Sequence, residues 1–170
     1  MNFSDPFFLD LVVNLSDYFS KEISKEVIFK FKSREKIRIR DLAWENHKES
    51  YIQLFSCLSD YRAATLFSHD FLTHFSVLLL GLKSMDAGME NLNLVESFSA
   101  WLINKRLMSF FDQQNIPLKR TALVSSSAHL FNFSDHESIE LLTFQVFHGA
   151  KNMGAFLFLM SQDPNLGGGQ

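Results

Sequence analysis

The chain opens with apolar residues that recur at helical spacing. Asp5 and Pro6 suit the cap and the first position of a helix. The apolar side chains that follow lie three or four residues apart: Phe8, Leu11, Val12, Leu15, Tyr18, Phe19 and Ile23. This i, i+3, i+4, i+7 spacing predicts an amphipathic helix over residues 6–24.

Patterns typical of strands follow. Val27, Phe29 and Phe31 alternate with Ile28 and two lysines, and residues 37–42 alternate in the same way. Residues 51–58 and 61–67 form two further β-rich runs, which Ser59-Asp60 separates as a tight hairpin. These four runs predict an antiparallel meander. The basic run at residues 30–40 then lies on half-exposed strands, an interpretation that we favour over a basic binding patch.

Helical spacing returns in the middle of the chain. Ser68-His69-Asp70 can cap a short helix that ends at Gly81, and residues 83–88 form a loop. A long helix is predicted over residues 89–113, with Leu94, Val95, Phe98 and Trp101 on its buried face. Pro117 lies beyond its end.

The last third is strand-like again, over residues 118–133, 138–147 and 153–160, with a turn at 148–152. The fold class is therefore α+β: an antiparallel sheet packed by one long helix and two shorter helices. We expect a single domain over residues 1–161 and a flexible C-terminal tail at 162–170.

Composition excludes several classes of function. Of 170 residues 46% are hydrophobic and 21% charged, as in ordinary globular chains. The net charge of −3 argues against nucleic acid as the main partner. The longest apolar run, residues 75–82, is too short to span a bilayer, and the first residues lack a basic signal-peptide region, so we expect a cytoplasmic protein with no membrane insertion. Phe occurs 19 times, and most of these side chains must line a core; more of them than one core can hold would mean a partner surface.

Common enzyme motifs are absent from the sequence, including the phosphate-binding, dinucleotide-binding, nucleophile-elbow and H-E-x-x-H motifs. The six histidines are scattered and Cys57 is the one cysteine, so no metal site is predicted and Cys57 is expected in the core. Ser125-Ser126-Ser127 fits a polar strand edge better than a nucleophile.

One polar stripe stands at the start of the long helix. Asp86, Glu90 and Asn93 form the pattern D-x3-E-x2-N, and at helical spacing they share a face. Two carboxylates and a carboxamide could dock on a cationic partner and hold a water molecule. They could equally be an exposed first turn whose acids stabilise the positive end of the helix dipole.

The chain resembles the CheC/CheX/FliM family, which includes CheY-phosphate phosphatases of bacterial chemotaxis and the middle domain of the flagellar switch protein. Asp5-Pro6-Phe7 resembles an N-P-F opening, and residues 79–81 (LLG) resemble the end of a family helix. Residues 90–97 (ENLNLVES) are similar to the family's E-x-x-N-M-I-x-G helix, and residues 144–160 to its closing hairpin. The phosphatase motif, D/S-x3-E-x2-N, x22 and Pro, is matched by Asp86, Glu90 and Asn93, with Pro117 following after 23 residues.

This resemblance implies a function and its residues. Asp86 and Glu90 would bind a phosphorylated CheY-like receiver, with Glu90 pairing with a receiver lysine. Glu90 and Asn93 would be catalytic, with Asn93 orienting the water that attacks the aspartyl phosphate. The chain would need no cofactor of its own, because the receiver supplies the Mg²⁺. The family also implies a homodimer, which pairing of sheet edges could form.

The chain departs from the family pattern in three places. The first helix has Asn14 but Leu11 where a second site would need a glutamate, so one site at most is expected. In a second register Glu96 matches the family glutamate, and Ser99 then stands where the motif needs an asparagine. That register resembles the switch protein's R-x-L-T-x-I-E, although the G-G-x-G loop of the switch protein is replaced by Gly81-Leu82-Lys83.

Three hypotheses follow. The first is a CheX-like phosphatase acting on a phosphorylated receiver, with Glu90 and Asn93 exposed on the outer face of the long helix. The second is a non-catalytic adaptor or motor-switch scaffold of the same fold. The third is an unrelated α+β binding domain with a Phe-lined pocket.

Overall fold

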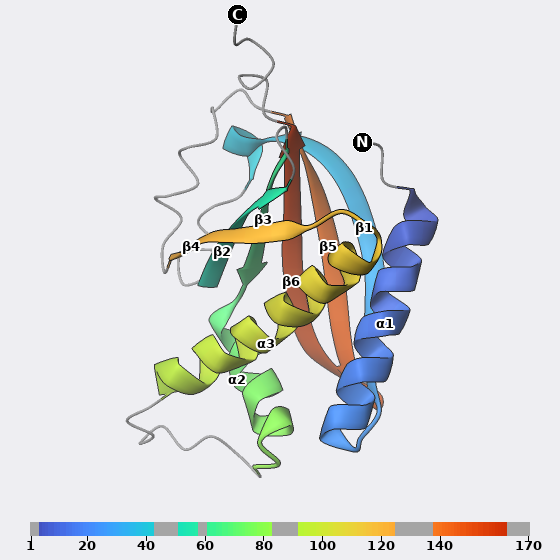
Figure 1. Ribbon diagram of the computed structural model, residues 1–170. Coiled ribbons are helices and arrows are strands. Elements are labelled where there is room, and N and C mark those ends of the chain that lie inside the picture. Colours follow the sequence, from blue (N-terminus) through green and yellow to red (C-terminus); the bar gives the residue numbers. More distant parts are fainter. Residues whose placement is uncertain (1–3, 43–50, 58–60, 83–91, 125–137, 163–170) are drawn as a thin grey trace, which may run out of the picture.

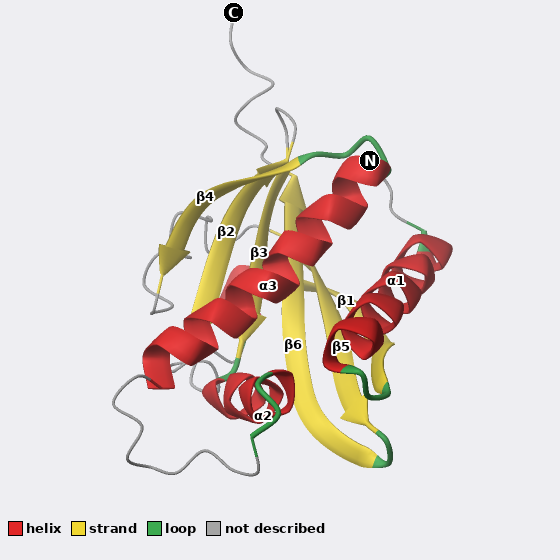
Figure 2. Ribbon diagram, turned by 60° about the horizontal axis from the view of Figure 1, so that its bottom comes forward, coloured by secondary structure: helices red, strands yellow, loops and turns green. Residues whose placement is uncertain are grey.

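The structure, a computed structural model, describes residues 4–42, 51–57, 61–82, 92–124 and 138–162. Its elements are α1 (Asp5–Ile23), β1 (Val27–Arg38), the 3-10 helix η1 (Ile39–Asp41), β2 (Tyr51–Cys57), β3 (Tyr61–Phe67), α2 (His69–Leu79), α3 (Leu92–Gln113), β4 (Leu118–Val124), β5 (Ser138–His148) and β6 (Lys151–Gln162). The strands form an antiparallel sheet in the order β1-β5-β6-β3-β2-β4. The three helices cover one face of this sheet, and α3 crosses it diagonally (Figures 1 and 2). The predicted α+β class is confirmed.

The predicted meander of four runs is wrong, although its last two runs do pair as the antiparallel strands β2 and β3. The sequence pattern predicts two separate strands that begin at residues 27 and 37, but residues 27–38 form one continuous strand. Ile39 then begins the 3-10 turn. β1 lies at the edge of the sheet beside β5, so the β5–β6 hairpin separates it from β3 and β2. Alternation along a strand shows which residues share a face, but it does not show which strand lies alongside. The Ser59-Asp60 turn and residues 125–133 of the predicted third-to-last strand lie outside the described residues.

The main core lies between the helices and the sheet. Phenylalanine dominates it: twelve Phe side chains are buried within the part of the chain that the structure describes. Their rings contact one another from different elements, as in the stacked pair Phe144 and Phe156 with centroids 5.0 Å apart, and in Phe19 against Phe75 at 5.2 Å. Since one core takes up most of the Phe, their number is not by itself evidence for a partner surface.

A second, smaller apolar cluster involves alternate residues of the same strands. It contains Ile39, Leu42, Ile52, Ala64, Leu66, Ile139 and Leu159. In β3, Leu66 belongs to this cluster while its neighbour Phe67 belongs to the main core, and successive strand residues point to opposite faces. The central strands are therefore buried on both faces.

The boundaries of α2 follow the sequence signals. The Ser68 hydroxyl accepts a hydrogen bond from the Phe71 backbone N–H, which caps the first turn. At the other end Gly81 adopts a φ of 66°, and the N–H groups of Gly81 and Leu82 donate to the carbonyls of Leu78 and Val77. This is the Schellman arrangement that a glycine just after a helix permits. The cap places His69 at the start of α2, next to α3.

Candidate functional site on the long helix

The sequence placed the candidate site at the start of α3. Asp86 and Glu90 lie outside the described residues. The backbone of Asn93 belongs to the first turn of α3, and its side chain is not described. The prediction that Glu90 and Asn93 are exposed therefore remains a prediction.

The predicted orientation of α3 is wrong. Leu94, Phe98 and Trp101 were expected to face the sheet, but 68%, 48% and 39% of their surfaces are exposed. The buried face is formed instead by Glu96, Ser99, Ala100, Ile103, Asn104, Leu107, Phe110 and Phe111. In its first half, α3 thus buries polar side chains and exposes apolar ones, which is the reverse of an ordinary amphipathic helix.

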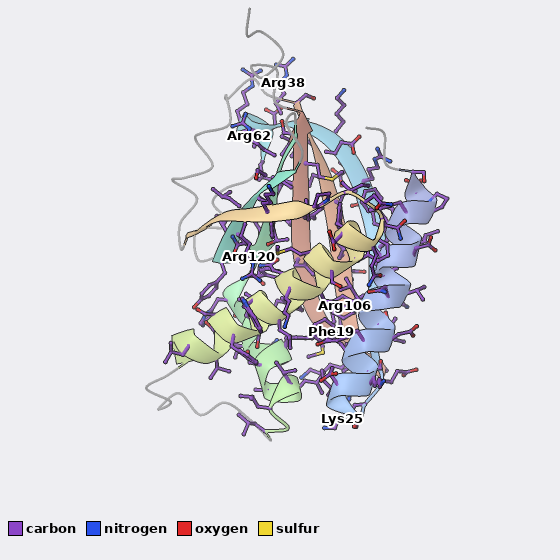
Figure 3. The ribbon with its side chains drawn as sticks, in the orientation of Figure 1. Phe19, Lys25, Arg38, Arg62, Arg106 and Arg120 are labelled. Carbon is purple, nitrogen blue, oxygen red and sulfur yellow. The ribbon has the colours of Figure 1, made fainter. Side chains whose placement is uncertain are left out.

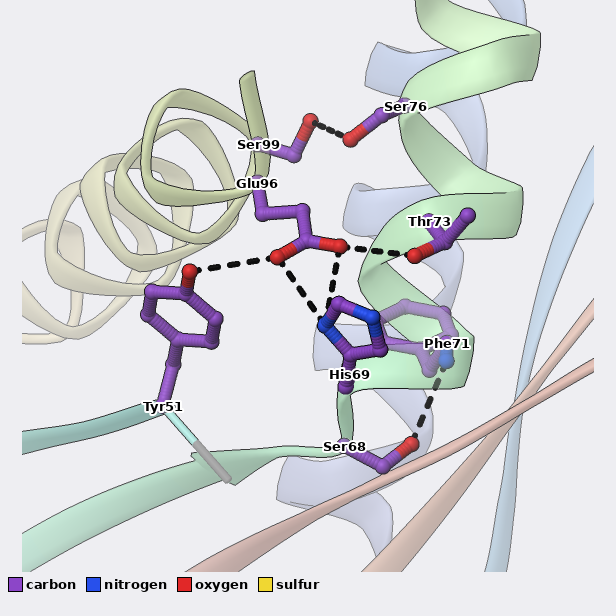
Figure 4. A network of polar contacts seen from close by, with 8 residues as sticks. All are labelled: Tyr51, Ser68, His69, Phe71, Thr73, Ser76, Glu96 and Ser99. Atoms are coloured by element: carbon purple, nitrogen blue, oxygen red, sulfur yellow. Dashed lines mark hydrogen bonds and ion pairs between the residues drawn. The ribbon is translucent and has the colours of Figure 1, made fainter. Parts of the chain in front are cut away.

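Glu96 is the centre of a buried polar network (Figure 4). Its carboxylate is 0% exposed. The Tyr51 hydroxyl donates to Oε2 at 3.1 Å, the Thr73 hydroxyl donates to Oε1 at 2.7 Å, and His69 Nδ1 lies 3.1 Å from Oε2. Tyr51 comes from β2, while His69 and Thr73 come from α2. The network therefore connects α3 to two other elements.

Tyr51 is held in its neutral form by this site. Burial raises the pKa of its hydroxyl, and the negative charge of Glu96 and the hydrogen bond to it raise the pKa further. A neutral tyrosine can donate to a carboxylate, and a tyrosine of ordinary pKa is already neutral near pH 7; the raised pKa extends this donor role of Tyr51 to more alkaline pH.

Two more polar contacts follow along the buried face of α3. The hydroxyls of Ser99 and Ser76 lie 2.7 Å apart, between α3 and α2. One turn further, the Thr65 hydroxyl of β3 donates to Asn104 Oδ1 at 2.8 Å. Glu96 and Ser99 are thus both bonded within the chain. In the register that matches Glu96 to the family glutamate, that carboxylate does not face a partner.

Sequence reasoning did not find the partners of Glu96. They lie 45, 27 and 23 residues before it. His69 was interpreted as part of a capping sequence, and no local pattern connects it to α3. Within the described ranges, no group of three or more His, Cys, Asp or Glu side chains could hold a metal ion. None of the helices seen there has the length and apolar character needed to cross a bilayer.

No protein-family model matches the sequence, and no curated protein matches it significantly. Solved structures do match. The FliM middle domain from Vibrio alginolyticus has a TM-score of 0.74 at 6% identity, covering 91% of this chain and 90% of that one. A chain of the FliG–FliM complex from H. pylori has a TM-score of 0.73 at 13% identity, with 94% of each chain covered. A CheC-like superfamily protein from Shewanella has a TM-score of 0.58 at 9% identity, over 95% and 99% of the two chains.

Likenesses at this level of identity show the fold. The chain has the α+β fold that FliM middle domains share with FliY, CheC-like and CheX proteins of the flagellar motor and chemotaxis.

Proposed function

We propose that this chain binds a phosphorylated CheY-like receiver and hydrolyses its aspartyl phosphate. The observation that supports the proposal most is the D-x3-E-x2-N spacing of Asp86, Glu90 and Asn93, which leads directly into the first turn of α3. Structures of CheC-like and CheX proteins share the fold that bears this helix. The proposal places the chain in the cytoplasm, where such receivers act.

Hydrolysis of the aspartyl phosphate requires few catalytic groups from this chain. In the hydrolysis, the oxygen of a water molecule bonds to phosphorus, the bond from phosphorus to the aspartyl oxygen breaks, and inorganic phosphate leaves. An acyl phosphate is an activated group, and the receiver holds the Mg²⁺ that neutralises its charge. The carboxamide of Asn93 would orient the water, while Glu90 and Asp86 would pair with cations on the receiver.

Phosphate release from an acetyl-phosphate-labelled CheY-like receiver tests the proposal. Wild-type chain should accelerate the release, and Asn93→Ala should reduce the acceleration about a hundredfold with little change in affinity. Glu90→Ala should weaken binding by about 2 kcal/mol, or about thirtyfold in Kd, and lower the rate with it. Gln113→Ala, an exposed carboxamide at the other end of α3, is the matched control and should behave as wild type. An Asn93→Ala variant as fast as wild type would contradict the assigned site.

A non-catalytic switch scaffold is the second candidate. The FliM middle domain and the chain of the FliG–FliM complex match over at least 90% of both chains with TM-scores of 0.74 and 0.73, above the 0.58 of the CheC-like structure. One of these structures is a complex with FliG. If the wild-type chain binds a receiver or a FliG-like protein and leaves phosphate release unchanged, the scaffold function is correct.

A further inference from the structure

The outward side of α3 carries three exposed apolar side chains in a row. Leu94, Phe98 and Trp101 are spaced i, i+4 and i+7, so they follow one another along two turns of the helix. Phe98 and Trp101 stack with ring centroids 5.7 Å apart and an angle of 26° between the planes. We call these three residues the α3 stripe. Contiguous exposed apolar surface of this kind is typical of interaction sites.

The exposure of the α3 stripe is not explained by an excess of apolar residues in α3. The same half of α3 buries Glu96 and Ser99, whose polar groups need partners from α2 and β2. Folding alone would favour the opposite arrangement, with the apolar side chains inside and the polar ones outside. A surface that opposes the folding preference points to a function outside the chain.

Two cations border the stripe. Lys105 Nζ lies 5.0 Å from the centroid of the Trp101 ring, and the Arg120 guanidinium carbon lies 5.8 Å from it. Arg120 reaches this place from β4, beside α3 (Figure 3), and its Nη2 donates a long hydrogen bond of 3.5 Å to the Trp101 carbonyl. Among the described residues neither cation forms an ion pair with a carboxylate.

The surroundings of Arg120 favour an anionic partner. Burial lowers the pKa of its guanidinium, and no negative charge of the described chain opposes the change. The outward carboxylate of Asp112 is eleven residues beyond Trp101, about 16 Å further along the helix axis. The apolar stripe thus ends in a positive region whose counterion is missing from the described chain.

We propose that the α3 stripe is a docking surface for an acidic amphipathic segment of a partner protein. The apolar side chains of the segment cover Leu94, Phe98 and Trp101, and its carboxylates pair with Lys105 and Arg120. A helix of about three turns matches the distance from Leu94 to Lys105. A second copy of this chain fits less well, because a twofold interface centred on the stripe would place Lys105 of each copy against the first described turn of the other copy's α3, where residues 92–95 include no carboxylate. The inference stands apart from phosphate hydrolysis, since it needs neither Glu90 nor Asn93.

Synthetic peptides test the surface directly. The probe is a fluorescein-labelled helical 16-residue peptide with Leu and Phe on one face and Glu on its flanks. Two companion peptides replace every Glu with Lys, or every Leu and Phe with Ser. Fluorescence polarisation against the full chain should show saturable binding of the acidic amphipathic peptide below about 100 µM, with the companions at least tenfold weaker.

Substitutions on the chain then locate the binding. Leu94→Ser and the double variant Lys105→Glu/Arg120→Glu should each weaken binding of the acidic peptide at least tenfold. Val13→Ser and Lys25→Glu are the controls, because Val13 is 58% exposed on α1 and Lys25 is exposed beyond its end, and both should leave binding unchanged.

Four results would overturn the proposal. The first two are that the acidic peptide does not bind and that the Lys peptide binds equally well. The third is that Val13→Ser and Leu94→Ser weaken binding equally. The fourth is that the chain self-associates and Leu94→Ser abolishes the self-association, which would make a second copy the occupant. A single-stranded oligonucleotide that binds through Lys105 and Arg120 while the acidic peptide does not would identify a nucleic-acid surface instead.

Discussion

At the scale of single residues, Glu96 is a fully buried carboxylate that needs hydrogen-bond donors from other elements. A carboxylate removed from water is costly unless hydrogen bonds replace its hydration. Tyr51, His69 and Thr73 supply these bonds from β2 and α2. The carboxylate therefore holds the first half of α3 against two neighbouring elements, and it does so from the helix face opposite the α3 stripe.

Replacing Glu96 should reveal this role in the free energy of unfolding. Glu96→Ala leaves the hydroxyls of Tyr51 and Thr73 and the ring of His69 without their acceptor, and we expect a loss of about 3 kcal/mol. Glu96→Gln keeps the volume and one acceptor oxygen, so its loss should be about half as large. Urea unfolding followed by circular dichroism at pH 7.5 measures both.

An exposed glutamate provides the comparison. Glu22→Ala on α1 removes a carboxylate that is exposed, and it should change stability by no more than about 0.5 kcal/mol. Equal stabilities of Glu96→Ala and wild type would show that the network contributes nothing to folding.

At the scale of elements, the β5–β6 hairpin is shaped by one glycine. Val146 pairs with Gly154 and Phe147 with Asn152, so Met153 is the extra residue of a β-bulge. Gly154 has a φ of 120°, a conformation almost restricted to glycine. A Cβ atom at this position would lie 3.2 Å from Phe71 Cβ, where α2 packs on β6.

Gly154→Ala should therefore destabilise the chain in two ways. The backbone conformation costs about 1–3 kcal/mol for a residue with a side chain, and the contact with Phe71 adds to this. Gly149→Ala is the matched control, because Gly149 also has a positive φ, of 57°, but has nothing within 4 Å of its added Cβ. Chemical denaturation should show the larger loss for Gly154→Ala by about 1–2 kcal/mol. Equal losses would mean that the approach of α2 to β6 is not tight.

The same scale shows what the sequence could and could not predict. Helical spacing located α1 and α2 to within a few residues, although the N-cap of α1 is Ser4 rather than Asp5. The β-rich runs located the strands, except that residues 27–38 form one strand where two were predicted. The order of the sheet was not predictable, because the paired residues of β1 and β5 are 100 or more positions apart in sequence. The orientation of α3 was wrong for a physical reason: Glu96, Ser99 and Asn104 find their partners only when the fold brings them together.

The candidate functional site likewise has one part that the sequence predicts and one part that it does not. The spacing of Asp86, Glu90 and Asn93 is local, so the sequence shows it directly. The α3 stripe could not be predicted, because the helical pattern of its apolar residues is the pattern of a buried face.

At the scale of the whole molecule, the edges of the sheet govern association with further copies. β1 forms one edge and β4 the other. The β1 edge is poorly suited to pairing, because it has a bulge after Phe31 and exposed charged residues at Lys30, Lys32, Glu35, Lys36 and Arg38. β4 is shorter, and in its described part it exposes two cations, Lys119 and Arg120.

We expect a homodimer that forms by antiparallel pairing of the β4 edges. Unpaired backbone N–H and C=O groups favour the pairing, whereas Lys119 and Arg120 of the two copies repel each other. Salt screens this repulsion, since the Debye length falls from about 14 Å at 50 mM to about 4 Å at 500 mM. Light scattering at about 50 µM should therefore show more dimer at the higher salt concentration.

Lys119→Ser should raise the dimer fraction at low salt, whereas Lys36→Ser on β1 should not. A monomer under every condition would refute the homodimer, and an equal effect of Lys36→Ser would move the interface to β1.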